Sequence, residues 1–201
     1  MPDIEQTDVD VSTRRPVVIS NFSQYVPPFD VVRITRRMLR SVPPEYLVGL
    51  DSVVLTSTDS LSRKRLRSTA KSRKRKIKIA NTRGLYHPQW NGGAAWIEVF
   101  VDRTLERWAK GLWLRIPIIR DMALSHVLFH EVGHHIHATT RPEFREREDV
   151  AESWRKKLEP RYFMRQYWWL RVLGYAVRPT LPLLRKVSTN HLKAKRGQAA
   201  S

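Results

Sequence analysis

The histidine-rich stretch HVLFHEVGHHIH at residues 126–137 constrains this chain more than any other feature. It lies in a segment, residues 120–139, that we expect to form one long helix because apolar residues recur along one side of it. His130 and His134 are four positions apart, so their imidazoles leave the same helical face one turn apart and can reach one ion. The spacing therefore predicts a metal site on this helix. The alternative is a solvated polar face on which histidines happen to cluster.

Glu131 follows the first of these histidines and lies one step round the helix from it. Its carboxylate is poorly placed to join the ligand pair, but it can reach a water in the open position of the metal. That geometry is the one a general base needs. The chain has no cysteine, so the metal must be held by His, Asp and Glu side chains. We expect one zinc ion, with His130 and His134 as ligands and Glu131 as the catalytic base.

Two histidines leave a catalytic zinc site short of one protein ligand. Thr140 occupies the position six residues after His134, so the elongated motif with a third histidine is absent. A second helix, expected over residues 142–158, carries Glu148 and Glu152 one turn apart. We predict Glu148 as the third ligand and Glu152 as the outer partner of a ligand histidine, with Glu152 as the substitute ligand. The alternative for these acids is surface pairing with nearby arginines and lysines.

His126 lies one turn before His130, on the ligand face of the same helix. From there it could donate a hydrogen bond to an oxyanion that develops during catalysis. A purely structural role is the alternative, and it is the commoner one for a histidine. The sequence does not select the residue that stabilises the oxyanion.

The pattern His130-Glu131-x-x-His134, followed by Glu148-x-x-Ala151-x-x-Trp154, resembles the gluzincin branch of the zincin metallopeptidases. The small ImmA/IrrE-type and minimal gluzincin domains are the most similar in pattern. The resemblance covers about residues 50–158. It implies an α+β domain in which a small mixed sheet packs on an active-site helix and a glutamate helix. It also implies hydrolysis of protein or peptide substrates, bound in extended form alongside a strand at residues 95–101 that rims the cleft.

Secondary-structure signals agree with an α+β class. Asp30 is expected to cap a helix over residues 31–40, and strands are expected at residues 50–57, 77–86 and 95–101. The two helices described above follow, and Pro160 is expected to end the second of them. The segment predicted here as the zincin-like domain is residues 21–160. Residues 1–20 are predicted to be a disordered acidic tail, and residues 161–201 an aromatic and basic C-terminal segment.

Positive charge is concentrated in two segments of a chain whose net charge is +18. Residues 61–78 contain ten Lys and Arg residues without an acid, and residues 161–201 contain nine without an acid. The rest of the chain has 18 basic and 19 acidic residues, so it is close to neutral. Basic segments of this kind predict non-specific contact with a polyanion, either nucleic acid or an anionic membrane. The simpler interpretation of residues 61–78 is a solvated loop inserted between two strands.

Two functions from different classes follow from these features. The first is a zinc metallopeptidase, and the second is a non-enzymatic polyanion-binding protein on a zincin-like scaffold. The first residues lack the basic start and apolar run of a signal peptide, and no uncharged apolar stretch reaches about 18 residues. We therefore expect a cytoplasmic protein, associated with a membrane or with nucleic acid if the basic segments bind a polyanion.

Overall fold

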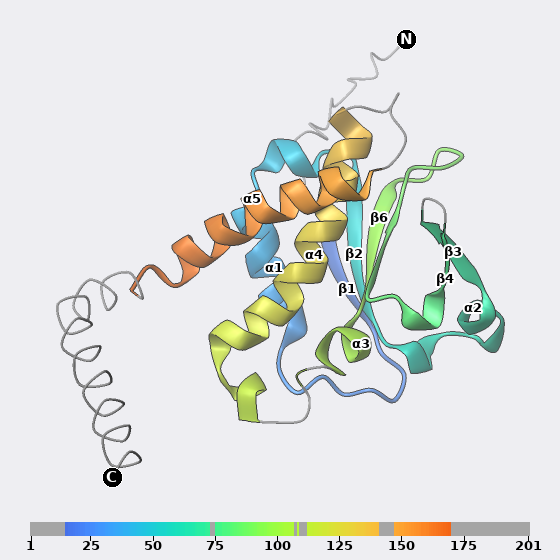
Figure 1. Cartoon of the computed structure of the whole chain (residues 1–201), viewed down its shortest axis with the longest axis horizontal. Coiled ribbons are helices and arrows are strands. Elements are labelled where there is room, and N and C mark those ends of the chain that lie inside the picture. The colour runs from blue at the N-terminus through green and yellow to red at the C-terminus, as the bar shows by residue number, and fades with distance from the viewer. Residues whose placement is uncertain (1–14, 73–74, 107, 109–111, 141–146, 170–201) are drawn as a thin grey trace, which may run out of the picture. The chain divides into compact units, whose positions relative to one another are not determined.

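The computed structural model describes residues 15–72, 75–106, 108, 112–140 and 147–169. The chain separates into two compact units, residues 1–162 and residues 163–201. The first unit is an α+β domain in which a four-stranded mixed sheet is combined with the helices that carry the histidines and glutamates (Figure 1). The predicted fold class is therefore confirmed.

The sheet has the strand order β1-β2-β6-β5. β1 (Val17–Asn21) pairs in parallel with β2 (Leu50–Thr56), and β2 pairs in parallel with β6 (Ala95–Phe100). β5 (Gly84–His87) is antiparallel to β6 and lies at the edge. β1 lies mostly within residues 1–20, so the prediction of disorder is wrong for this part of the tail. This segment has little helical or alternating pattern of its own, and it is ordered by its pairing with β2. Residues 1–14 of the predicted tail lie outside the described residues.

The strand at residues 95–101 does not rim a cleft, contrary to expectation. β6 is an inner strand with β2 on one side and β5 on the other. Five of its six residues are buried, as an inner strand covered on both faces requires. The two edge strands are β1 and β5, and β5, which is next to β6, is only four residues long.

Helix α4 (Pro117–Thr140) carries the histidines and packs on β5 and β6 (Figure 1). It begins at a proline, whose fixed φ and missing N–H suit the first helical position. Helix α5 (Glu148–Gln166) follows, and α1 (Val31–Ser41) and α3 (Val101–Glu106) complete the longer helices. Asp30 caps α1 as predicted, accepting a hydrogen bond from the backbone N–H of Arg33 at 2.8 Å. Short 3-10 turns occupy Pro44–Leu47, Thr58–Ser60, Ile79–Asn81 and Leu112–Arg115.

Helix α5 does not end at Pro160, which lies inside it. The residue that holds the chain helical beyond the proline is Tyr162, which is 1% exposed. Its hydroxyl donates to the buried carboxylate of Asp121 on α4 and accepts from Nε of Arg37 on α1 at 3.0 Å. Arg37 also donates to both oxygens of Asp121, at 2.7 and 3.0 Å. This buried network joins three helices, and it overrides the local preference of proline to end one of them.

The basic insertion, residues 61–78, is not a solvated loop. It forms helix α2 (Arg63–Arg67) and an antiparallel hairpin of β3 (Thr69–Ser72) and β4 (Arg75–Lys78). Arg65 Nη2 lies 2.5 Å from Oε2 of Glu98, a residue of β6 that is 2% exposed. This ion pair anchors the insertion to the sheet. The strand expected at residues 77–86 is accordingly divided into β4, a 3-10 turn and β5.

The second unit is described only over Phe163–Trp169, where the last turn of α5 ends at Gln166. The rings of Phe163 and Tyr167 stack there with centroids 5.8 Å apart. Most of the predicted aromatic and basic C-terminal segment, residues 170–201, lies outside the described residues. Within the described part of the chain, no helix combines the length and the apolar character needed to cross a membrane.

Candidate metal centre

His130 and His134 lie on one face of α4, as their spacing predicts. Their rings are 4.8 Å apart at an interplanar angle of 87°. His134 is 5% exposed, and burial together with the neighbouring His130 lowers the pKa of His134 to about 4. His134 is therefore neutral at pH 7, which is the form of imidazole that binds a metal.

Glu148, the first residue of α5, faces both of these imidazoles. Its Oε2 lies 3.2 Å from Nε2 of His130 and 3.6 Å from Nε2 of His134. The donor atoms of the three side chains all lie within 4.8 Å of one another. Two imidazoles and one carboxylate form a donor set that zinc accepts, and three protein ligands leave a position open for water or substrate. The residues present therefore fit a single metal ion.

The close crossing of α4 and α5 brings Glu148 to the histidines. A Cβ atom built on Gly133 of α4 would lie 2.6 Å from the carbonyl oxygen of Ala151 and 2.9 Å from its Cα. Glycine is thus required at this position, because any side chain would push the two backbones apart. Ala151 is fully buried at the contact and lies one turn after Glu148. Small residues on both helices therefore set the distance between the carboxylate and the imidazoles.

Glu152 lies on the other side of His130. Its Oε2 is 3.8 Å from Nδ1 of His130, whereas Glu148 faces Nε2. Arg155 holds the Glu152 carboxylate through two hydrogen bonds of 2.6 and 2.8 Å, and this pairing lowers the pKa of Glu152 to about 2. A carboxylate on the far nitrogen orients an imidazole and fixes which nitrogen is protonated. Glu148 and Glu152 thus lie at different nitrogens of His130, and their roles as third ligand and outer partner stay predictions.

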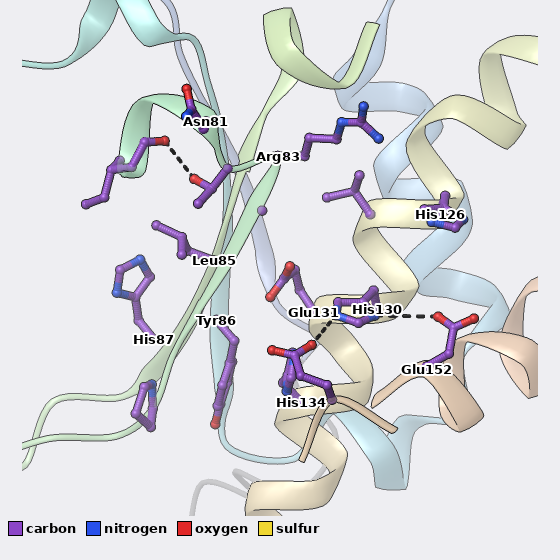
Figure 2. Close-up of a pocket in the computed structure, with 16 residues that line it drawn as sticks. Asn81, Arg83, Leu85, Tyr86, His87, His126, His130, Glu131, His134 and Glu152 are labelled. Carbon is purple, nitrogen blue, oxygen red and sulfur yellow. Dashed lines mark hydrogen bonds and ion pairs between the residues drawn. The ribbon is translucent and has the colours of Figure 1, made fainter. Parts of the chain in front are cut away.

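Glu131 points from α4 toward β5 (Figure 2). It is 7% exposed, and a Cβ atom on Gly84 would lie 2.7 Å from its Oε1. The absence of a side chain at Gly84 leaves room for the carboxylate between the helix and the edge strand. Glu131 therefore lies beside His130 and His134, on the side of α4 that faces the edge strand β5.

A groove of about 800 Å³ runs between β5 and α4 and includes the three proposed ligands, Glu131 and Glu152. Searches against protein-family models, curated proteins and solved structures found no match.

His126 also lines the groove, one turn before His130, and its side chain is exposed. Burial of part of the ring and the nearby Arg155 lower the pKa of His126. Figure 2 shows His126 on α4, on the side of His130 that lies away from His134. The structure thus brings His126 to the groove without giving it a contact that would identify a role.

His135, which the motif does not use, is fully buried behind the site. Its Nε2 lies 3.0 Å from the carbonyl oxygen of Val48 and its Nδ1 lies 3.4 Å from the hydroxyl of Tyr86. Since a carbonyl oxygen only accepts, Nε2 carries the proton, and Nδ1 of the neutral ring accepts from Tyr86. His135 therefore positions a residue of the edge strand.

Sequence reasoning missed the whole contribution of β5, including Gly84, Tyr86 and the preceding Arg83. All three line the groove. A strand was expected over residues 77–86, but no local pattern indicated that its last residues lie at the edge of the sheet beside the histidines. The order of strands depends on pairing between segments that are distant in the sequence.

Proposed function

We propose that this chain is a zinc-dependent metallopeptidase of the gluzincin type, acting on protein or peptide substrates. The observation that carries the proposal is the convergence of His130, His134 and Glu148, whose donor atoms lie within 4.8 Å, in a groove that also contains Glu131. A purely structural metal site is closed and has no use for an adjacent carboxylate. A groove bordered by a sheet edge is the surrounding that an extended substrate needs.

His130, His134 and Glu148 would hold the ion, and Glu152 would orient His130 from its Nδ1 side. Zinc bound there would supply a Lewis acid and lower the pKa of a bound water. Glu131 would serve as the general base, taking a proton from the attacking water and passing it to the leaving amine. Gly84, which has no side chain, leaves space for this carboxylate beside the edge strand.

The substrate backbone pairs with β5 in this proposal. Among the described strands, β5 has a hydrogen-bonded neighbour on one side only, which is β6. Strand addition at a free edge gives affinity through backbone hydrogen bonds and leaves selectivity to side-chain pockets. The substrate strand expected at residues 95–101 is thus replaced by its neighbour at residues 84–87.

The test is the Glu131→Gln variant, which keeps the shape of the side chain and removes its basicity. We expect Glu131→Gln to bind zinc stoichiometrically and to lose at least about 100-fold in peptide cleavage, because general-base catalysis contributes on this order. Cleavage of a peptide library by wild type and variant would be compared, with zinc content measured in both. Equal cleavage by the two proteins would refute the proposal.

Binding to a polyanion remains the second candidate function. The observation in its favour is that Arg63, Lys64 and Arg67 lie on helix α2, which the ion pair of Arg65 with Glu98 holds to the sheet. The three positive charges are therefore held at a defined place on the domain. If this were the sole function, the Glu131→Gln variant would behave as wild type in every assay. The same experiment therefore separates the two candidates.

A further inference from the structure

A smaller cavity adjoins the groove at the start of β5. This cavity, of about 320 Å³, is lined by Asn81, Arg83, Arg103 and Glu106. Asn81 and Arg83 also line the larger groove, so the two spaces are neighbours on either side of these residues. A substrate lying along β5 would extend one of its ends into this cavity.

Arg83 supplies an uncompensated positive charge at this end of the groove. Its backbone carbonyl accepts a 2.8 Å hydrogen bond from the N–H of Phe100, which fixes its main chain against the end of β6. Its side chain is exposed and extends from the start of β5 toward α4 (Figure 2). Within the described residues, its guanidinium has no ion pair.

Arg103 of α3 brings a second guanidinium to the same cavity. One of its nitrogens, Nη1, lies 3.2 Å from Oε2 of Glu106, a carboxylate that is itself 69% exposed. An exposed pair of this kind is weak, so the arginine is only partly neutralised. The four residues that line the cavity therefore have a net positive charge, with two arginines against one carboxylate.

The charge around the proposed ligands is more nearly balanced, because Arg155 pairs with Glu152 and a bound divalent ion would offset Glu131 and Glu148. An acidic residue of a bound peptide therefore gains an arginine partner at the Arg83 end of the groove. Arginine forks match the two oxygens of a carboxylate, which gives direction as well as attraction. The charge along the groove thus discriminates between positions of the substrate.

Building on the proposed peptidase activity, we propose that the cavity of Asn81, Arg83 and Arg103 is a carboxylate subsite. It selects substrates with an acidic group at one position to one side of the scissile bond. The carboxylate comes either from an Asp or Glu side chain or from the free C-terminus of a short peptide. Arg83 is the specificity-determining residue, and Glu106 competes with the substrate for Arg103.

The test uses peptide pairs that differ only by Glu or Gln at one position, scanned on both sides of the cleaved bond. Wild type is expected to cleave the Glu peptide with a kcat/KM about tenfold higher at a single position, mainly through KM. Arg83→Gln should abolish this preference. Glu106→Gln should strengthen it, because Arg103 is released. Arg36→Gln, which removes an exposed arginine of α1 outside the groove, is the matched control and should leave the preference unchanged.

Peptides with free and amidated C-termini distinguish the two sources of the carboxylate. Equal cleavage of all Glu and Gln pairs, and of free and amidated peptides, would overturn the subsite and leave the peptidase activity standing. Absence of any cleavage would instead overturn the proposed function. In that event, binding of the same labelled peptides to the zinc-loaded protein, followed by fluorescence anisotropy, would still decide the subsite. No difference in affinity between Glu and Gln peptides would refute it.

Discussion

At the scale of single residues, the two glutamates of α5 differ in which nitrogen of His130 they face. Glu148 lies at Nε2 of both histidines, whereas Glu152 lies at Nδ1 of His130 and is held by Arg155. A metal ion shared by the two imidazoles can be reached by the first carboxylate and not by the second in this arrangement. Their substitution should therefore have unequal effects on metal binding.

We expect Glu148→Gln to weaken zinc binding by roughly 100-fold or more, because a direct ligand is lost. Glu152→Gln should weaken it by about tenfold, which is typical of a residue that orients a ligand. Titration of the purified variants against a competing chelator measures both constants. The double variant His130→Ala, His134→Ala should retain no zinc. If Glu152→Gln proved the more damaging of the two, Glu152 would have to replace Glu148 as the third ligand.

The residues of the site differ in how far sequence could locate them. His130, Glu131 and His134 share one helix, so the helical repeat alone fixes their mutual positions. Glu148 depends on how α5 crosses α4, and the sequence indicates that crossing only through the small residues Gly133 and Ala151. Arg83 and Gly84 reach the site through strand pairing across residues distant in the sequence, and no local pattern encodes that pairing.

At the scale of elements, helices and strands with a strong local pattern were predicted, whereas features that depend on contacts between distant segments were not. The helix capped by Asp30, α4 and the strands at residues 50–56 and 95–100 have strong local signals and are where they were expected. The order of strands in the sheet has no local signal, so the exposed edge was assigned to the wrong strand. The extension of α5 past Pro160 depends on Tyr162 reaching Asp121, a contact made only in the folded domain.

The crossing of α4 and α5 offers a direct test of how elements position the site. Ala151→Leu adds three carbons where the backbone of α5 already touches Gly133, so α5 must shift and withdraw Glu148 from the histidines. We expect zinc affinity to fall at least about tenfold and stability to fall by about 1–3 kcal/mol, as overpacking generally costs. Chelator titration and thermal unfolding measure the two effects.

Ser153→Leu is the control for this substitution, since Ser153 lies on the same helix with its side chain exposed. It should change neither zinc affinity nor stability appreciably. An Ala151→Leu variant with wild-type zinc affinity would show that the close crossing does not set the position of Glu148.

At the scale of the whole molecule, the charge distribution suggests separate roles for two regions. The groove would cleave peptides, and the basic insertion would bind a polyanion. Deleting residues 63–76 would be a poor test of these separate roles, because it removes Arg65, the closer partner of the buried Glu98, and leaves that carboxylate only His87 at 3.4 Å. Replacing Arg63, Lys64 and Arg67 with Gln removes three exposed charges and keeps the anchor. This triple variant should bind DNA, RNA or anionic vesicles more weakly at low salt than wild type and should cleave peptides unchanged.

The salt dependence gives the expected size of the effect. Each lost phosphate contact reduces the slope of log K against log salt concentration by about 0.9 on duplex DNA, so three lost contacts reduce it by roughly 3. Binding measured at several salt concentrations, with peptide cleavage in parallel, supplies both quantities. Unchanged binding together with lost cleavage would show that the insertion belongs to the active site, and would refute the separate roles of the two regions.

The contact between Gly84 and Glu131 has a consequence for how such a groove can change over time. A single added methyl group at residue 84 would compete with the Glu131 carboxylate for the same volume, while the three proposed ligands lie on other elements. In the proposed peptidase, a change from glycine to alanine at residue 84 would therefore be able to remove hydrolysis without removing the metal ion. A lineage that exchanged hydrolysis for capture of a peptide would need to alter neither the histidines nor the glutamates.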